Sequence, residues 1–538
     1  MSPATATPPP ARRPIGEALL NRNRFRILGL TPDEIIKYFF GSNATVAVIV
    51  LALITVFLFR EGAGFFGMNA ANIRIYRLAG LEYVDFIRQQ VDAHTAINRT
   101  LNDLRLAQFH RLAASGLAVG QANEALAGFD AFANAYGDSV EDVRGILSDL
   151  TEAATAIKTK EVVNGDLAEQ KQMLIGAKRA DEAAQIAITP VDFAQETGAL
   201  TAVFPAYQAA NKEFAGKLTA ALALAPSMPD AKLRAQIGRI QTQTTEFIAT
   251  FPQIEAGMQA WRYDAPIPAW KSLTGFLFGR QWLTASFWQD WYGLIPLFVG
   301  SLLVSVIALT FAVPLGVSAA IYVSEIAGVR EKNLIKPYIE FISAIPSVVL
   351  GFFGIAVLGT ALRWISQTPW LSWFPGFPMS ERLNSLTAGA LLALMAVPTI
   401  FSLSEDALTN VPKHLKEASY ALGANRFQTI VRILVPASLS GIISAILLGF
   451  GRVIGETMVV LLCAGNRIAI PDFTQGLGAF FQPVHTMTGI IAQEMGEVVP
   501  GSIHYRALFM VGIVLFLLAL LINFIAQKIV ARYRISIG

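Results

Sequence analysis

The sequence predicts an all-α, polytopic membrane protein with six transmembrane helices and a large extracytoplasmic helical bundle. Apolar residues make up 54% of the chain and charged residues only 15%, and the mean hydropathy is +0.49. This composition is too apolar for a purely soluble protein. Six apolar runs are long enough to cross a bilayer. Residues 61–291, between the first and second of these runs, contain no such run and are rich in Ala, Gln and Glu.

Residues 1–38 are predicted to be a basic segment that stays in the cytoplasm. Their cations are Arg12, Arg13, Arg22, Arg24, Arg26 and Lys37. Nucleic-acid binding is disfavoured because neither interleaved aromatic residues nor a folded recognition module accompanies these cations. A basic flank instead holds this end of the chain on the inner side of the membrane. Residues 39–60 form the first span, and their apolar run is too long for a cleaved signal peptide, so we expect a membrane anchor.

Residues 61–291 are expected to form the bundle on the outer side. The segment has about 20 basic and 25 acidic residues, so it is mildly acidic whereas the rest of the chain is basic. Apolar residues at helical spacing mark buried helix faces; examples are Val84, Ile87, Val91, Ile97, Leu101 and Leu104. Breaks are expected at 137–138, 164–165, 189–190 and 226–229, and they predict four or five helices joined by short turns. His94 and His110 lack neighbouring ligands, so packed or solvated histidines are expected rather than a metal site. A sensor, a dock for a soluble binding protein and a spacer all remain open.

Residues 292–538 are predicted to be a five-helix membrane core. The second span is expected at 293–326, kinked at Pro314, and the third at 339–362, after a basic cytoplasmic link. Ser347, Gly351 and Gly354 are small residues of the third span, where they favour close helix packing more than ligand binding. The fourth span is expected at 386–403 and the sixth at 507–526. Residues 465–505 are expected to be an outer loop that dips toward the membrane around 490–491.

A cytoplasmic loop at 405–436 connects the fourth and fifth spans. Residues 417–436 read EASYALGANRFQTIVRILVP and are too polar to lie in lipid. Apolar residues at steps of three and four predict an amphipathic helix over most of this stretch. Gly423 interrupts the pattern and costs about 1 kcal/mol relative to Ala inside a helix, so it predicts either a break or the close approach of a partner.

The fifth span, expected at 437–464, contains two opposite charges. Arg452 lies about fifteen residues beyond Pro436, which is roughly 22 Å along a helix. A charge at that depth costs at least about 2.5 kcal/mol, so it should face the interior or a water-filled path. Glu456 follows at i+4, where it can neutralise the guanidinium. The pair is either structural or part of a path for anions, since a guanidinium presents a donor fork that suits a tetrahedral oxyanion. Cys463, the single cysteine, is expected to be a small buried apolar residue.

The loop carries a recognisable family pattern. Glu417-Ala418-Ser419, then Gly423, then Ile433, Val435 and Pro436 resemble the EAA loop of ABC importer permeases. Ser419 and Val435 depart from that pattern by small changes. The resemblance implies a coupling helix that seats in a cleft of a separate ATPase subunit. It assigns this coupling to five residues: Glu417, Ala418, Gly423, Ala424 and Arg426.

The fifth span further resembles the phosphate-specific branch of these importers. The matching segment is Gly451-Arg452-Val453-Ile454-Gly455-Glu456-Thr457-Met458, and Met458 favours the first of the two paired permeases. The resemblance implies a substrate pathway made by Arg452, Glu456, Thr457 and Ser347. It covers the first span and about 293–538, whereas the bundle departs from the compact pattern and leaves the docking of a binding protein open.

The resemblance implies a multi-pass protein of a bacterial inner membrane, and the basic residues of the short inner loops predict that both termini lie in the cytoplasm. No Gly-x-x-x-x-Gly-Lys-Ser/Thr motif occurs in the sequence. We therefore expect no cofactor on this chain, with ATP and Mg²⁺ bound by an ATPase dimer. The other expected partners are a second permease, an extracytoplasmic phosphate-binding protein and membrane lipid, and no nucleic acid. Two alternatives stay open: a permease for another oxyanion, such as phosphonate or molybdate, and a membrane sensor that uses the bundle.

Overall fold

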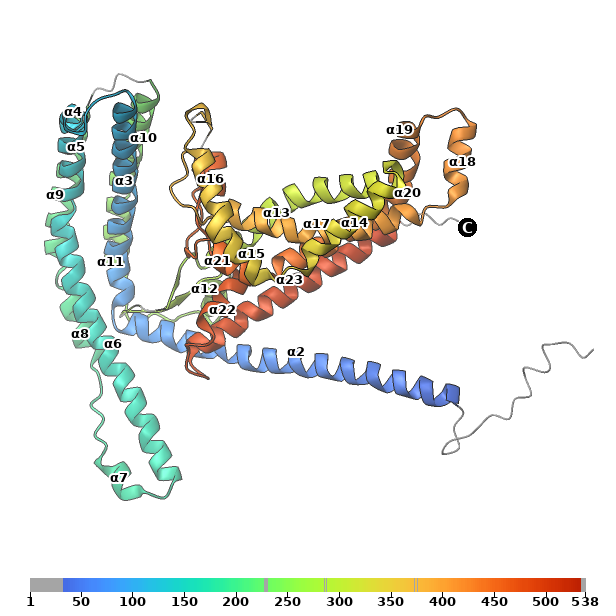
Figure 1. The fold of residues 1–538 in the computed structure, drawn as a ribbon. Helices are drawn as coiled ribbons and strands as arrows, with labels where there is room; N and C mark the ends of the chain where they lie inside the picture. The colour runs from blue at the N-terminus through green and yellow to red at the C-terminus, as the bar shows by residue number, and fades with distance from the viewer. Residues whose placement is uncertain are drawn as a thin grey trace, which may run out of the picture.

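A computed structural model describes residues 32–226, 231–284, 286, 288–371, 373–374 and 376–533. It divides into a helical bundle at one end and a set of long membrane helices, which run away from the bundle (Figure 1). Six helices in the described residues are long and apolar enough to cross a membrane. The all-α class and the six spans are therefore confirmed. Residues 1–31 of the predicted basic segment lie outside the described part of the chain.

The first span and the start of the bundle are one helix. Helix α2 (Pro32–Leu78) runs past the predicted end of the span at residue 60, and Gly62, Gly64 and Gly67 do not interrupt it. Gly80 then adopts φ +80°, a left-handed conformation that allows the chain to turn into α3. Tyr76, near the end of α2, is already buried in the core of the bundle. This helix fixes the bundle directly to the membrane part.

The bundle is built from helices of 6 to 36 residues, and the longer ones pack around one apolar core. Its helices are α3 (Leu81–Ala114), α4 (Val119–Ala125), α5 (Ala127–Asp138), α6 (Glu141–Gly176), α7 (Ala180–Gln185), α8 (Phe193–Thr201), α9 (Phe204–Ala223), α10 (Ala231–Ala249), α11 (Phe251–Ala260) and α12 (Trp270–Phe278). The break predicted at 164–165 is wrong, since α6 continues to Gly176 and extends beyond the other helices with α7 at its tip (Figure 1). His94 is buried, its Nε2 lies 2.9 Å from the carbonyl oxygen of Tyr136, and burial lowers its pKa. His110 is exposed, so both histidines match the expectation of packed or solvated residues.

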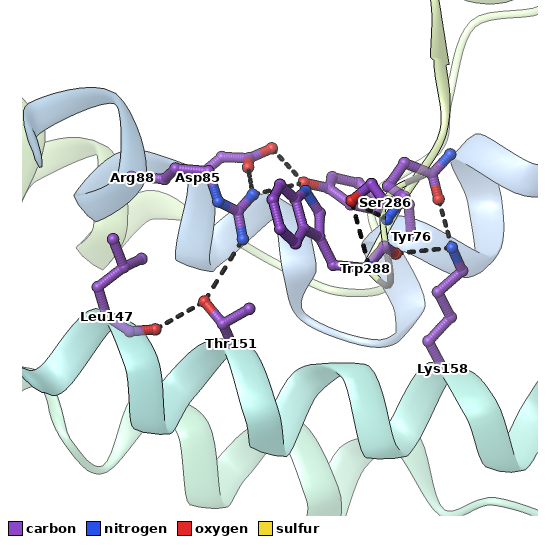
Figure 2. A network of polar contacts seen from close by, with 9 residues as sticks. Tyr76, Asp85, Arg88, Leu147, Thr151, Lys158, Ser286 and Trp288 are labelled. Carbon is purple, nitrogen blue, oxygen red and sulfur yellow. Dashed lines mark hydrogen bonds and ion pairs between the residues drawn. The ribbon is translucent and has the colours of Figure 1, made fainter. Parts of the chain in front are cut away.

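A short hairpin leads from the bundle to the membrane helices. Its strands are β1 (Trp282–Leu283) and β2 (Trp291–Tyr292), which pair antiparallel. Lys158 of α6 donates from Nζ to the carbonyl oxygen of Trp288 at 2.7 Å and to Oε1 of Gln289 at 2.6 Å. The guanidinium of Arg88 lies 4.9 Å from the centre of the Trp288 ring (Figure 2). These contacts hold the hairpin against α3 and α6, so the bundle has a second attachment besides α2.

The membrane core comprises the remaining elements. They are α13 (Ile295–Ile321), η1 (Tyr322–Ile326), α14 (Val329–Ala344), α15 (Ser347–Phe353), η2 (Gly354–Leu358), α16 (Gly359–Ser366), η3 (Pro369–Leu371), α17 (Ser385–Thr409), α18 (Lys413–Ala421), α19 (Arg426–Thr429), η4 (Ile430–Leu434), α20 (Val435–Ile454), α21 (Met458–Cys463), η5 (Phe473–Phe481), α22 (Met487–Glu494) and α23 (Ile503–Tyr533). Helices α13, α17 and α20 pack on one another around a core that includes Val304, Leu391, Ala396, Ile400 and Val453. Figure 1 places α18 and α19 at the end of the membrane helices that is opposite to the bundle.

In the membrane core, the third span begins later than the sequence predicts and the predicted outer loop is partly helical. The third span begins at Ser347 rather than 339, because Pro346 ends the preceding turn and α14 is a separate amphipathic helix with no buried residue. Glu340 therefore lies on α14, outside the span. The predicted outer loop 465–505 contains the buried helix α22, and Ile490 in it is fully buried against α13 and α23. The expectation that this stretch dips toward the membrane is consistent with that burial.

Candidate functional site

The fifth span is broken at the residues that the sequence marks as functional. Helix α20 ends at Ile454, and α21 begins only at Met458. Between them Gly455, Glu456 and Thr457 form a short turn, closed by a 3.2 Å hydrogen bond from the Glu456 amide to the Val453 carbonyl. The prediction of one continuous helix over 437–464 is therefore wrong.

Because of this break, Arg452 and Glu456 do not form the predicted ion pair. No ion pair between them is found among the described residues. Arg452 donates from Nη1 to the hydroxyl of Thr399 on α17 at 3.2 Å. Glu456 accepts instead, at Oε1, a 3.2 Å hydrogen bond from the amide of Met458, at the start of α21. A continuous helix would have brought the two charges together at i+4, so the pairing fails for a reason of backbone geometry.

Arg452 is exposed on the surface of this single chain, whereas Glu456 and Thr457 are half-buried. An arginine in a membrane helix does not face lipid, because its charge is too costly there. The exposed guanidinium therefore marks a side of α20 that faces water or another protein chain. Four of the five hydrogen-bond donors of this guanidinium have no described acceptor within the chain, so the group can bind an anion.

The backbone of Glu456 is held by a helix from the outer loop. The hydroxyl of Thr488, on α22, donates to the carbonyl oxygen of Glu456 at 2.8 Å. Beside this contact is a cavity of about 10 Å³, which is room for about one water molecule. Its lining residues are half polar (Ser301, Ser305, Glu456, Thr486 and Thr488) and half apolar (Val304, Leu392, Val453, Ile454 and Val460). Sequence reasoning missed Thr399 and Thr488, because neither lies near the charged residues along the chain.

The structure places Ser347 at the first position of α15, where it is half-buried. Helix α15 packs closely against α21: a Cβ at Gly351 would lie 2.5 Å from Cδ1 of Leu462. The buried thiol of Cys463 donates to the carbonyl oxygen of Gly351 at 3.3 Å. Small residues in this span thus permit close packing, as predicted. In the described chain no hydrogen bond joins Ser347 to Arg452, so Ser347 remains only a candidate for the pathway.

The predicted coupling loop folds as two helices joined by a tight turn. Helix α18 ends at Ala421, and Gly423 adopts φ +81°, a left-handed conformation that favours glycine. Asn425 then caps α19 by accepting from the amide of Gln428 at 2.8 Å. Ser419 and Thr429 share a buried 2.9 Å hydrogen bond between their hydroxyl oxygens, which ties the two helices together. The break at Gly423 is confirmed. A Cβ added there would meet nothing within 4 Å in this chain.

The outer face of this turn is exposed and partly apolar. Glu417, Ala418 and Arg426 are exposed, and Ala424 is half-buried. Leu422 is 89% exposed and Phe427 is 73% exposed. Apolar side chains that cluster at the tip of a polar loop are typical of a surface that is covered by a partner.

The turn is braced by Glu325, which lies in η1 directly after α13. The buried carboxylate of Glu325 pairs with Lys416 of α18. The backbone carbonyl oxygen of Glu325 accepts a hydrogen bond from the guanidinium of Arg426 on α19. Glu325 itself is only 8% exposed. A buried charge pair with additional hydrogen bonds fixes orientation well, because losing one partner leaves the other charge buried alone. A force on α18 is therefore passed to α13 as well as to α20.

One family model and several known proteins are similar to this chain. The model described as binding-protein-dependent transport system inner membrane component matches residues 312–535. The probable ABC transporter permease protein YqgH of Bacillus subtilis is 38% identical over 242 residues, which cover 44% of this chain and 72% of that protein. The phosphate transport system permease protein PstC of Pasteurella multocida is 30% identical over 301 residues, covering 54% and 90%. A solved structure of the MetNI methionine ABC transporter in inward-facing conformations is 20% identical, covers 45% of this chain and 94% of that chain, and has a TM-score of 0.32.

Proposed function

This chain belongs to the family of binding-protein-dependent transport system inner membrane components, and on that premise we propose that it is the permease subunit of an ATP-driven importer of inorganic phosphate. It forms half of the translocation pathway in a bacterial inner membrane. Its relatives named as phosphate transport permeases support the substrate. The matched residues include both the coupling turn and the broken fifth span.

The observation that carries this proposal is the guanidinium of Arg452, which lies in a membrane helix without an ion-pair partner in the described chain. A planar guanidinium binds a tetrahedral oxyanion through two parallel hydrogen bonds. Phosphate at neutral pH is such an anion, and it offers several acceptor oxygens. Arg452 is thus the proposed contact to the passing phosphate, with Thr399 holding the side chain in place. Glu456 and Thr457, at the helix break, line the same pathway, and Ser347 at the start of α15 is a further candidate.

Energy enters at the other end of the fifth span. The exposed turn of α18 and α19 is proposed to seat in a cleft of a partner ATPase dimer, which binds ATP and Mg²⁺. Glu417, Ala418, Gly423, Ala424 and Arg426 form this contact. Closure of the ATPase would move the turn as a rigid body, because Glu325 and the Ser419–Thr429 bond fix its shape. Since η4 continues directly into α20, the movement reaches Arg452 through one helix.

The remaining partners follow from this role. A second permease subunit would cover the exposed side of α20 that bears Arg452, and an extracytoplasmic phosphate-binding protein would deliver the anion. Lipid surrounds the apolar outer faces of the spans. Both termini are proposed to lie in the cytoplasm, since the start of α2 and the end of α23 are at the same end as α18 (Figure 1).

Phosphate uptake by membrane vesicles that contain the complete transporter tests this function. Arg452→Ala should reduce uptake at least tenfold, and Arg452→Lys should restore it only in part, because an ammonium lacks the donor fork. Arg467→Ala, in the outer loop and exposed, is the matched control and should leave uptake unchanged. Competition with molybdate and with a phosphonate identifies the anion. Uptake that either competitor inhibits better than unlabelled phosphate would assign a different oxyanion, and unchanged uptake in both Arg452 variants would remove the site.

A further inference from the structure

The break in the fifth span decides whether Arg452 is free. In a continuous α-helix the carbonyl of Glu456 would accept from the amide of Val460, four residues on, and Glu456 would lie one turn above Arg452. In the structure the helical ladder restarts one residue later, with a 2.9 Å hydrogen bond from the Leu461 amide to the Thr457 carbonyl. The carbonyl oxygen of Glu456 accepts from the hydroxyl of Thr488 instead, at 2.8 Å. One side chain from another helix thus replaces a backbone hydrogen bond.

Thr488 is itself fixed in place. It is 7% exposed, and its hydroxyl also lies 3.3 Å from that of Thr486. Thr486 caps α22 by accepting from the amide of Gly489 at 3.1 Å. The amide of Met487 donates to the hydroxyl of Ser301, on α13, at 2.9 Å. The first turn of α22 is therefore held by α13, and it presents the Thr488 hydroxyl to the break at a defined position.

We propose that Thr488 is a positioning residue for phosphate transport: its hydroxyl holds the fifth span broken at Glu456 and so keeps that carboxylate away from Arg452. This inference rests on the proposed function of Arg452. When the hydroxyl is lost, the half-buried Glu456 carbonyl has no donor, which is unfavourable unless the helix closes. When the helix closes, the Glu456 carbonyl accepts from the Val460 amide, and the Glu456 carboxylate lies one helical turn from Arg452, where the two charges pair. The guanidinium then no longer binds the substrate.

Three substitutions separate this role from simple packing. Thr488→Ser keeps the hydroxyl, and Thr488→Val keeps the shape but removes the donor. Thr488→Ala removes both, but it enlarges the adjacent cavity, which already has room for about one water molecule. A water there can donate to the Glu456 carbonyl. Positioning by the hydroxyl predicts that uptake decreases in the order Ser, Ala, Val. Packing predicts that Val is tolerated best, because it is nearly isosteric with Thr.

Uptake of phosphate by vesicles that carry the complete transporter provides the measurement, normalised to the amount of assembled complex. The maximal rate should fall at least fivefold in Thr488→Val and less than twofold in Thr488→Ser, with Thr488→Ala between them. In a Glu456→Gln background, where no carboxylate can capture Arg452, Thr488→Val should cause less than a twofold further loss. A rate for Thr488→Val equal to or above that of Thr488→Ala would overturn the inference, and so would the same fold loss in both backgrounds.

Uptake by these variants distinguishes a wrong role for Arg452 from a wrong role for Thr488. If Arg452→Ala transports phosphate normally, the proposed function of the site is wrong. If Arg452→Ala is inactive but Thr488→Val transports like the unchanged protein, only the role of Thr488 is wrong. If Thr488→Val reduces the amount of assembled complex, Thr488→Ala in the two backgrounds decides instead: positioning predicts that its loss of uptake largely disappears with Glu456→Gln, whereas packing predicts the same fold loss in both backgrounds.

Discussion

Gly423 allows the proposed coupling of this chain to an ATPase to be tested separately from the folding of the chain. It adopts φ +81°, and a Cβ at this position meets nothing within 4 Å in the chain itself. A side chain here therefore costs only backbone strain in the isolated permease. That strain is about 1–2 kcal/mol for Ala and less for Asn, which tolerates the left-handed conformation better. Thermal stability of the purified permease should thus decrease in the order Gly, Asn, Ala.

A docked partner reverses that order. If the ATPase surface lies against the turn, added volume decides the effect, and Asn is larger than Ala. Stimulation of ATPase activity in the reconstituted complex should then decrease in the order Gly, Ala, Asn, with Gly423→Asn losing at least tenfold. Two assays on the same three proteins, a thermal melt and ATP hydrolysis, provide the comparison. ATPase activity that follows stability, with Gly423→Asn at least as active as Gly423→Ala, would refute docking at this turn.

Three further predictions concern contacts away from the pathway. Glu325→Gln removes the charge partner of Lys416, so the phosphate transported per ATP hydrolysed should fall severalfold while ATP hydrolysis persists. The control Glu497→Gln, at an exposed residue of the outer loop, should change neither quantity. Burial alone would raise the pKa of Glu82, but hydrogen bonds from Arg77 and Lys271 lower it to about 2. The ionised Glu82 carboxylate therefore contributes about 2 kcal/mol to the stability of the bundle above about pH 5, and this contribution is lost as the pH falls toward 2. Glu82→Gln should make the free energy of unfolding less dependent on pH over this range, as measured by denaturation at a series of pH values. Lys158→Met removes two hydrogen bonds to the hairpin and should speed amide exchange at 288–292 at least threefold, whereas exposed Lys160→Met should not; equal exchange in the two would contradict the clamp.

Much of the fold follows from local sequence patterns. Long apolar runs predicted all six spans, because the cost of unsatisfied backbone in lipid leaves helices as the main solution. Gly423 predicted a break in the loop, because glycine is both a poor helix residue and the residue best suited to positive φ. The basic link after the second span was recognised, but its continuation as the separate helix α14 was not. Pro346 was the available signal, since a proline often follows the end of a helix.

The geometry of the pathway could not be predicted in the same way. The i+4 spacing of Arg452 and Glu456 indicates an ion pair only if the helix is continuous. Gly455, the C-cap of α20, is a local signal for the break, but Gly449 and Gly451 lie within the same helix, so glycine alone does not locate the break. At the break, the carbonyl oxygen of Glu456 accepts a hydrogen bond from Thr488, which is 32 residues away along the chain. Similarly, Thr399 is 53 residues from Arg452. Tertiary hydrogen bonds of this kind override local helix preference and have no periodic signature.

The structure also restricts the roles of the bundle. Helix α2 enters its core without interruption, and the hairpin is clamped between α6 and the membrane helices. On the membrane side, Trp282 donates from Nε1 to Glu494 at 3.3 Å, and His504 contacts the same carboxylate at 2.7 Å. Two such attachments make a freely hinged spacer unfavourable. A fixed platform for an extracytoplasmic partner agrees better with this arrangement.

The side of the membrane on which the coupling turn lies decides whether a cytoplasmic ATPase can drive this chain through that turn. Cys463 is fully buried, so single cysteines introduced at Leu422 in the turn and at Val163 in the bundle can be labelled against a low background. Membranes stripped of the ATPase are treated with a maleimide that cannot cross the bilayer. The Leu422→Cys variant should be labelled only in inside-out vesicles and the Val163→Cys variant only in right-side-out vesicles. Labelling of both variants from the same side would contradict a permease driven through this turn by a cytoplasmic ATPase.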